Sequence, residues 1–561
     1  MRRDILLILI LGVIVSACSL NGSYGLRVLT LAGVYALSTI GFHIVFGLAG
    51  ALSLAHGAFF GVGAYTTGIL STRYGLPFEI TFLLSMLIPA LLAVVIAAPT
   101  VRLESHYFSL ATLAIAQALL IAAVHGEEIT GGANGLAGIP GLNIFGRHIE
   151  RGWPHVTLVW SLVAIGGAIA WKIGDSLYGC GQRISRDHPM VAKSLGLNLG
   201  RMRMEALIIS ATYAGAAGAL TAHLHRVVSP EVLEFPVMVS ALTMTVTGGR
   251  QRVLGAIAGA LILVPLPEVL RDLGRGYLIV YGAALLFSVL LLPNGLAGRR
   301  RPPHRTQKAS ASPLPFFLTG GTLTLSRVEK RFGGVIALDD VSCIFPPGVV
   351  TGLIGANGSG KTTLINVITG MERPDSGNIR LDNQTLSSLP PEQIARSGIA
   401  RTFQTVAISA DDTVLEAVIA ARAAGRDRSM ARAQIIARSC LALLYLEGVA
   451  EQRCGDLSPG ILRRVEIARA LACEPRVLLL DEPSVGLTDT EQEALANRLR
   501  ALAATGLTIL AVDHSMSFLW KAVDRIACME NGHIIAEGSP NEIQCNPQVR
   551  AAYLGNNFSS I

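Results

Sequence analysis

Long apolar segments dominate the first half of this 561-residue chain. A helix needs about 20 mostly apolar residues to cross the hydrocarbon core of a bilayer. Only 15% of the chain is charged, against about a quarter in an ordinary globular protein. The pattern predicts an α-helical polytopic membrane domain of about ten transmembrane helices. The apolar segments are 4–20, 26–48, 51–70, 78–98, 107–125, 155–172, 204–225, 237–248, 252–270 and 276–293.

The basic residues are concentrated in the apolar half. Residues 1–310 carry 23 Lys and Arg against 13 Asp and Glu, whereas the remainder carries 23 against 26. Lysine and arginine are enriched in cytoplasmic loops, so 173–202 is predicted inside and 126–152 outside. A nucleic-acid-binding protein would instead place a basic face on its soluble part. The acidic second half therefore speaks against a nucleic-acid partner.

The N-terminus allows two interpretations. A basic start, an apolar run and "VSAC" ending at Cys18 resemble a lipoprotein cleavage box. Arg2 and Arg3 before an apolar run fit an uncleaved first helix equally, and the apolar segments that follow favour the helix. The eight cysteines form no CxxC pair and no Cys/His cluster with metal spacing, so they are predicted to be reduced structural thiols.

A change of composition marks the end of the membrane domain. Residues 298–320 mix basic residues with Pro, Ser and Gly, which is typical of a linker. Short β-branched runs such as "VVTGLIG" and "RVLLLDEP" then alternate with helical stretches, which predicts a soluble α/β domain. We therefore predict a membrane domain over 1–297, a cytoplasmic linker over 298–320 and a nucleotide-binding domain over 321–561.

The stretch "GANGSGKTT" fits the phosphate-binding pattern G-x-x-x-x-G-K-[ST]. It follows a predicted strand and opens a predicted helix, which is the context this pattern requires. Backbone N–H groups and the helix N-terminus would surround the phosphates of ATP. Lys361 would reach the β- and γ-phosphates, and the Thr362 hydroxyl would bind Mg²⁺. The predicted nucleotide-binding residues here are Gly355, Asn357, Gly358, Ser359, Gly360, Lys361, Thr362 and Thr363.

Four further residues complete the predicted site. Asp481 ends the apolar run "RVLLLD" and would hold Mg²⁺ through water, and Glu482 would polarise the attacking water as general base. Gln404, in "ARTFQ", would orient water and touch Mg²⁺. His514, in "LAVDHSM", follows another apolar run and would contact the γ-phosphate. The alternative for Asp481 and Glu482 is a surface acidic pair at a strand end, and the alternative for Gln404 and His514 is a structural role.

The order of these motifs resembles the nucleotide-binding domain of an ABC transporter, a P-loop ATPase with a helical subdomain. The resemblance covers about residues 322–555. The opening "KRFGGVIALDDVS" and the ending "EGSPNEIQCNPQVRAAYLG" resemble the ATPases of the branched-chain (hydrophobic) amino acid importers. The resemblance implies that Phe332 stacks on adenine. It also implies that 411–456 forms the helical subdomain that faces the permease.

The stretch "LSPGILRRVEIARAL" stands where this family carries LSGGQ or a near variant. The resemblance implies that Ser458 and Gly460 contact the γ-phosphate of the ATP held by the opposite domain. Ser458 is predicted as the N-cap of the following helix and Pro459 as its first residue. Ile461 replaces the glutamine and removes a polar group near the nucleotide. The loop is predicted to function, in full or in weakened form; the alternative is a site that binds ATP but barely hydrolyses it. Thr488 also departs from the acidic residue or asparagine common after "GL".

The membrane half resembles the permease of the same importer class. The similar stretches are 41–70, 130–140 and 246–263. The cytoplasmic stretch 183–198 resembles the coupling segment that docks on the ATPase. The alternative, without the resemblance, is an amphipathic loop of no specific function. Three polar residues in apolar segments are candidates for the transport pathway or for buried structural roles: His43, His56 and Gln117.

Together these resemblances imply a fused half-transporter. It would import branched-chain or related hydrophobic amino acids with ATP across the bacterial inner (plasma) membrane, its ATPase domain being cytoplasmic. A second permease and a second ATPase would complete it as a homodimer or a heteromer, with an extracytoplasmic solute-binding protein as partner. The same machinery importing urea, short amides or aromatic acids is the alternative. A non-transport ABC ATPase and an ATP-gated channel-like regulator are more distant ones.

Overall fold

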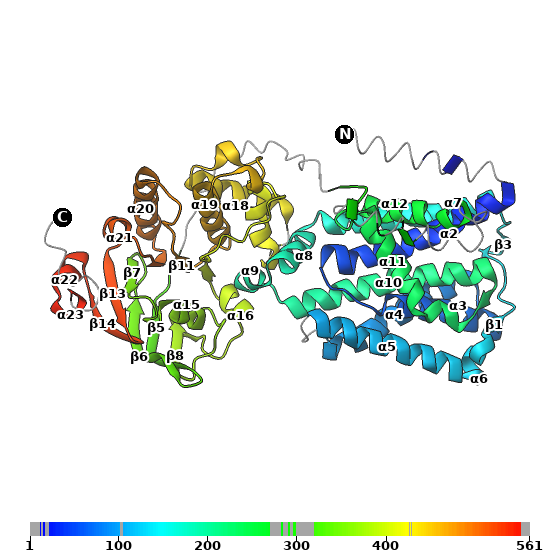
Figure 1. The fold of residues 1–561 in the computed structure, drawn as a ribbon, viewed down its shortest axis with the longest axis horizontal. Coiled ribbons are helices and arrows are strands. Elements are labelled where there is room, and N and C mark those ends of the chain that lie inside the picture. Colours follow the sequence, from blue (N-terminus) through cyan, green and yellow to red (C-terminus); the bar gives the residue numbers. More distant parts are fainter. Residues whose placement is uncertain are drawn as a thin grey trace. The chain divides into compact units, whose positions relative to one another are not determined.

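The chain forms two compact units, shown with their elements in Figure 1. The first comprises Met1–Arg186 and Leu199–Pro302, and the second comprises Asp187–Asn198 and Pro303–Ile561. The computed structural model describes residues 22–100, 105–269, 295–298, 319–425 and 429–550, with isolated residues 12, 15, 16, 282, 283, 286, 290, 291 and 427. The predicted helices 4–20 and 276–293 fall almost entirely outside these ranges, as does most of the linker. The predicted domain boundaries therefore stay predictions.

The first unit is helical, with short strands in its connections. Its long helices are α2 (Gly22–Phe42), continued by the π-helix η1 (His43–Leu48), α3 (His56–Arg73), α4 (Phe78–Thr100), α5 (Ser105–His125), α7 (Trp153–Gly174) and α10 (Leu199–His225). Shorter ones are α6 (Glu127–Thr130), η2 (Gly132–Asn134), α8 (Leu177–Asp187), η3 (Pro230–Leu233), α11 (Phe235–Gly248), α12 (Val253–Leu263) and α13 (Leu266–Val269). The strands are β1 (Leu136–Ala137), β2 (Asn143–Ile144), β3 (Arg147–His148) and β4 (Val227–Val228).

Five helices in the described residues are long and apolar enough to cross a membrane: Gly22–Leu48, Phe78–Thr100, His106–His125, Trp153–Gly174 and Leu199–His225. They confirm a membrane domain with several apolar helices, whereas the count of ten stays a prediction. The predicted segment 252–270 is not one helix but two, α12 and α13, which are separated at Val264 and Pro265. Proline lacks the N–H that a continuous helix needs, which explains the break.

Glycines allow α10 to approach its neighbours closely. A Cβ added to Gly63 of α3 would lie 2.4 Å from the Cα of Gly215 in α10, and one added to Gly215 would lie 2.0 Å from the carbonyl oxygen of Ser85 in α4. A Cβ on Gly218 would lie 2.0 Å from the carbonyl oxygen of Phe60. Small residues permit such contacts between membrane helices. The backbones of α3, α4 and α10 thus form the centre of this unit.

One histidine connects three of these helices. His56, at the start of α3, lies 3.0 Å from the Ser38 hydroxyl of α2 through Nε2 and 3.0 Å from the Ser210 hydroxyl of α10 through Nδ1. Its ring also packs edge-on against Phe42. Both ring nitrogens are satisfied inside the helix bundle, so this geometry favours the structural interpretation of His56.

The second unit is built on two sheets. The six-stranded sheet has the order β10 (Ile399–Arg401), β11 (Val477–Asp481), β12 (Thr508–Val512), β7 (Val350–Gly355), β13 (Arg525–Glu530) and β14 (His533–Gly538). Its strands are parallel except for β14. The four-stranded antiparallel sheet has the order β6 (Val335–Phe345), β5 (Leu323–Phe332), β8 (Ser376–Leu381) and β9 (Gln384–Thr385). This confirms the predicted α/β class.

Helices complete the second unit. The helices associated with the sheets are α15 (Lys361–Ile368), α16 (Pro391–Arg396), α20 (Asp489–Ala504), α21 (Met516–Ala522), α22 (Pro540–Cys545) and α23 (Pro547–Val549). A helical group comprises α17 (Val414–Ile419), η5 (Ala420–Ala424), α18 (Met430–Leu443), η6 (Glu447–Val449) and η7 (Cys454–Asp456), and α17 and α18 pack against α19 (Pro459–Leu471). Figure 1 shows α18 and α19 side by side. This group occupies the predicted helical subdomain, 411–456.

Candidate active site of an ATP-binding unit

Four adjacent parallel strands bring the predicted catalytic residues to one edge of the sheet. The strands β10, β11, β12 and β7 are adjacent and parallel, so their carboxyl ends lie along the same edge of the sheet. Gln404 follows β10, Glu482 follows β11, His514 follows β12, and the glycine-rich loop follows β7. Ligands of open α/β sheets bind outside the carboxyl ends of the strands. Topology alone therefore collects residues that lie up to 160 positions apart in the sequence.

The glycine-rich loop is closed around Lys361. The ammonium of Lys361 donates to the carbonyl oxygens of Gly355 at 2.7 Å and Ala356 at 2.8 Å. Burial lowers the pKa of Lys361, and Glu482, with smaller contributions from other acidic groups, opposes that shift. Gly358 and Gly360 have φ of +82° and +104°, which L side chains rarely adopt. The loop is thus a ring of backbone with a buried cation inside it.

Two other catalytic candidates contact the carboxylate of Glu482. Gln404 donates from Nε2 to Glu482 Oε1 at 3.0 Å, and His514 Nε2 lies 3.2 Å from the same oxygen. Glu482 has φ of +50°, an unusual value for a residue with a side chain, and its N–H donates to the Val512 carbonyl at 2.7 Å. The backbone strain and the two polar partners fix where this carboxylate lies.

The signature loop has the predicted cap. Ser458 is the N-cap of α19, with its hydroxyl accepting from the Ile461 N–H at 3.4 Å, and Pro459 is the first helical residue. Ser458 is exposed, Ile461 is half-buried, and Gly460 is buried against Leu487 and Gly486. Phe332, at the end of β5, is 45% exposed, with Lys330 Nζ 5.2 Å from its ring centroid. Within the described residues, no hydrogen bond or ion pair joins Ser458, Gly460 or Phe332 to Glu482.

Thr488 caps another helix. Its hydroxyl accepts from the Glu491 N–H at the start of α20, and the Glu491 carboxylate accepts from the Thr488 N–H at 3.0 Å, which is a capping box. The residue that departs from the family pattern thus has a structural role in this chain.

Three family models match the chain. They are the branched-chain amino acid transport system permease component over residues 24–292, the ABC transporter over 338–485, and the branched-chain amino acid ATP-binding cassette transporter over 533–559. The branched-chain amino acid transport ATP-binding protein BraF of Pseudomonas aeruginosa is 35% identical over 248 residues, which is 42% of this chain and 97% of BraF. The chain belongs to the branched-chain amino acid ABC transporter family.

A second relative and a solved structure are also similar to this chain. LivG of Escherichia coli K12, a high-affinity branched-chain amino acid transport ATP-binding protein, is 36% identical over 249 residues, covering 42% of this chain and 97% of LivG. A nucleotide-free ATP-binding cassette of an ABC transporter is 33% identical in its crystal structure, covering 42% of this chain and 99% of its own, with a TM-score of 0.39. This ABC transporter chain therefore carries a permease and an ATP-binding domain in one polypeptide.

The sequence prediction missed Arg401, which lies against the predicted Mg²⁺ ligand. Arg401 Nη2 donates to Asp481 Oδ2 at 3.1 Å, and Nη1 donates to the Asn366 amide oxygen at 2.6 Å. Both members of the ion pair are nearly inaccessible to water. Burial lowers the pKa of Arg401, and the charge of Asp481 opposes that shift. The sequence carries no signal for this pair, because only the fold shows that β10 lies beside the strand that ends in Asp481.

Asp513 was missed as well. Its carboxylate accepts from the N–H of Ser484 at 2.9 Å, from the hydroxyl of Ser484 at 2.7 Å and from the N–H of Ser515 at 2.9 Å. Its side chain is buried. Asp513 thus orients the segments that follow two neighbouring strands. A carboxylate directly before a candidate histidine was the signal in the sequence.

The site of this ABC transporter chain fits ATP with Mg²⁺. The buried ammonium of Lys361 and the open backbone of the glycine-rich loop suit a polyphosphate. The hydroxyl of Thr362, the amide of Gln404 and the carboxylate of Asp481 are hard oxygen donors, which Mg²⁺ prefers. The residues therefore match both groups chemically.

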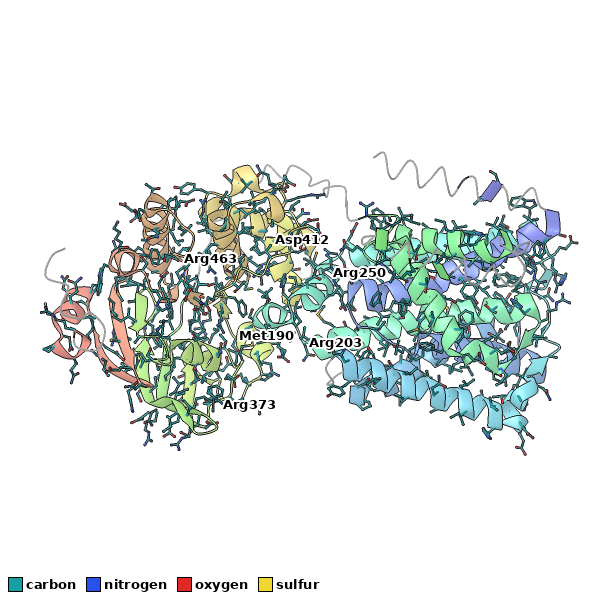
Figure 2. The ribbon with its side chains drawn as sticks, viewed as in Figure 1. Met190, Arg203, Arg250, Arg373, Asp412 and Arg463 are labelled. Carbon is teal, nitrogen blue, oxygen red and sulfur yellow. The ribbon has the colours of Figure 1, made fainter. Side chains whose placement is uncertain are left out.

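The predicted coupling segment packs on the ATP-binding domain. Residues Asp187–Asn198, which include α9 (Pro189–Ser194), belong to the second unit, whereas 183–186 end α8 in the first. Arg396 of α16 donates to the Gly196 carbonyl at 2.9 Å, and Asn198 donates to Glu392 at 2.8 Å. Met190, labelled in Figure 2, is an exposed residue of α9. Docking is thereby confirmed for 187–198.

Proposed function

We propose that this chain imports branched-chain amino acids, driven by hydrolysis of ATP. The observation that carries the proposal is the hydrogen-bonded group of Gln404, Glu482 and His514 beside the phosphate-binding loop, in a chain that also carries the permease domain. An intact catalytic cluster is needed for hydrolysis, and a permease in the same polypeptide gives the hydrolysis a transport step to drive.

The roles of the catalytic residues follow from the geometry. Glu482 accepts the proton of the attacking water, and its partners Gln404 and His514 hold the carboxylate through Oε1. His514 also contacts the γ-phosphate, and Lys361 neutralises the β- and γ-phosphates. Gly355, Asn357, Gly358, Ser359, Gly360 and Thr363 supply backbone or hydroxyl donors to the phosphates, and Phe332 stacks on adenine.

Thr362, Gln404 and Asp481 would hold Mg²⁺, partly through water. The ion would supply positive charge that neutralises the phosphates. Arg401 balances the charge of Asp481 inside the protein, so that the carboxylate stays ionised in a buried place.

The assembly is a dimer of permease and ATPase domains. Ser458 and Gly460 of one ATP-binding domain complete the site of the other, so one copy of this chain is half of the machine. Either a second copy or a related permease and ATPase completes the membrane-embedded complex, which sits in the bacterial inner membrane and receives its amino acid from an extracytoplasmic binding protein. Differential affinity of the two states for ATP drives the permease between inward and outward access.

Uptake of labelled leucine tests the proposal. Cells that lack this chain are complemented with the wild type, with Glu482→Gln, or with Glu493→Gln, which alters an exposed glutamate of α20. We expect the wild type and Glu493→Gln to restore uptake and Glu482→Gln to fail at equal abundance in the membrane. Restoration by Glu482→Gln would contradict the catalytic assignment.

Competition identifies the cargo. An excess of unlabelled isoleucine or valine should suppress uptake of labelled leucine, whereas urea, acetamide and phenylacetate should not. Suppression by one of the latter, with no effect of isoleucine, would move the cargo to that class and leave the ATPase assignment standing.

A further inference from the structure

Three charged side chains lie buried on one face of α19. Arg463, Glu466 and Arg469 are spaced at i, i+3 and i+6, so they share a face of the helix. Their side chains are only 3%, 1% and 6% exposed. Charges are buried at a large cost in free energy unless partners satisfy them. Such a face needs an explanation beyond helix packing.

The partners of this face are the backbone groups of residues 403–407, an irregular segment that follows β10. Arg463, labelled in Figure 2, donates to the carbonyl of Phe403 and, at 2.8 Å, to the carbonyl of Gln404. Glu466 accepts from the N–H of Phe403 at 3.0 Å, and Arg469 donates to the carbonyl of Ala407 at 2.6 Å. The segment that carries Gln404 is thus attached to α19 at both of its ends.

The charged groups also hold one another. Glu466 lies 2.8 Å from Arg463 and 3.7 Å from Arg469. Burial raises the pKa of Glu466, and the two arginines oppose that shift. Burial also lowers the pKa of Arg469, again opposed by Glu466. Arg463 thus contacts Glu466 and two backbone carbonyls, and Arg469 contacts Glu466 and one. A shift of one of these side chains would therefore disturb the contacts of the others.

Segment 403–407 carries the catalytic candidate Gln404. The backbone carbonyl of Gln404 accepts from Arg463, while its side chain donates to Glu482.

We infer that Arg463, Glu466 and Arg469 are positioning residues which attach segment 403–407 to α19, so that Gln404 reaches Glu482 only when α19 is correctly placed. The inference rests on the proposed ATP hydrolysis. It adds three residues that hold the segment carrying Gln404 in place. The alternative is that the group only satisfies buried backbone polar groups and has no influence on the reaction.

Hydrogen exchange of the purified full chain tests the attachment directly. Arg463→Lys keeps the positive charge. An ammonium lacks the planar set of N–H donors with which a guanidinium can bond two carbonyls and a carboxylate at once. We expect amides of 403–407 to exchange about tenfold faster in this variant, while β7 and β11 keep their protection. Arg498→Lys, at an arginine that covers Tyr445, is the matched control and should leave 403–407 unchanged. Unchanged exchange in Arg463→Lys would overturn the inference, whether or not the wild type hydrolyses ATP.

Kinetics separate positioning from mere structural support. We expect Arg463→Lys to lower kcat for ATP by about 10- to 100-fold, with KM changed by less than about threefold. In a Gln404→Ala background, the same substitution should cause no further loss, because the residue it positions is absent. Losses that multiply in the double variant would show that the group does not act through Gln404. Arg469→Lys repeats the test should Arg463→Lys fold poorly. An inactive wild type with fast exchange in Arg463→Lys would contradict the proposed function and leave the attachment standing.

Discussion

The two units of this chain bury polar groups by opposite means. The permease unit is centred on glycines that bring backbones together, and its buried His56 is paired with two serine hydroxyls. The ATP-binding unit buries full charges, in the pair of Arg401 with Asp481 and in the Arg463, Glu466 and Arg469 group. His56 thus has neutral partners, whereas these charged residues of the second unit form ion pairs.

The difference follows from what each unit must hold in place. Charged groups are costly in a bilayer, so close backbone packing has to position the permease helices. A soluble catalytic domain must orient carboxylates and loops near phosphate, and buried guanidinium groups do so with directional hydrogen bonds. Removing one charge from the ATP-binding unit should therefore cost more than adding one methyl group to the permease unit.

The largest effect is expected at Arg401. Arg401→Met leaves Asp481 as a buried carboxylate without its ionic partner, so the free energy of unfolding of the ATP-binding unit should fall by about 3–5 kcal/mol. ATP hydrolysis should be lost as well. Thermal unfolding of the purified chain measures the first effect, and Arg380→Met, at an exposed position of β8, is the control.

A second substitution shows whether the lost charge is the cause. Asp481→Asn in the Arg401→Met background removes the unpaired charge and keeps the side-chain shape. Most of the stability should return while hydrolysis stays absent. A double variant no more stable than Arg401→Met would show that packing, not charge, explains the loss.

The next effect concerns the close helix crossings of the permease. Gly215→Ala places a Cβ 2.0 Å from the Ser85 carbonyl oxygen and 2.8 Å from Pro89, so α10 and α4 must separate. We expect a loss of about 1–3 kcal/mol, seen as a lower melting temperature in detergent and less leucine uptake. Gly174→Ala is the matched control, because a Cβ there meets nothing within 4 Å. Equal melting temperatures for the two variants would show that this crossing tolerates side chains.

The sequence places the predicted ATP-site residues in short motifs at strand ends, and the fold brings those strand ends together, while the roles of the residues stay predictions. Gln404, Asp481, Glu482 and His514 each follow an apolar strand, and parallel strands bring such residues together whatever the distance between them in the chain. The cap at Ser458 could also be predicted, since a cap depends only on neighbours in the sequence. Local chemistry and strand order therefore account for most of the site.

The partners of buried charges could not be predicted. Nothing in "ARTFQ" indicates that Arg401 pairs with Asp481, 80 residues later. The spacing in "RRVEIAR" does place Arg463, Glu466 and Arg469 on one helix face, but only the fold shows that residues 403–407 cover it. In the membrane half, α3 contains many small and polar residues, which lower its mean hydropathy and make it hard to recognise as a membrane-spanning helix. The number of spans therefore did not follow from composition.

A smaller effect is expected at Thr488. Thr488→Ala removes the capping box of α20 and should cost about 1 kcal/mol in the free energy of unfolding. The bond that the hydroxyl accepts from the Glu491 N–H does not depend on pH. The backbone N–H of Thr488, which the variant keeps, and then the hydroxyl lower the pKa of Glu491, so the hydroxyl's bond to the carboxylate is lost as the pH falls through that lowered pKa. Melting curves of wild type and variant should therefore differ less in acid than at neutral pH, and an equal difference at both would show that the hydroxyl acts only on the N–H.

The smallest effect is expected at Ile461, which belongs neither to a buried charge group nor to a close helix crossing. Its half-buried side chain follows the exposed Ser458 at the start of α19, where the family carries glutamine. Ile461→Gln restores a polar group near the nucleotide of the opposite domain without touching Arg463 or the cap. We expect kcat for ATP to rise by about two- to fivefold, the gain of a single exposed hydrogen bond, with an unchanged melting temperature. Leu462→Gln, one residue further along the helix, should give no such gain. A rise of several hundredfold would instead mean that the natural loop holds ATP without hydrolysing it, and that hydrolysis in the assembled transporter takes place in a site completed by a different subunit.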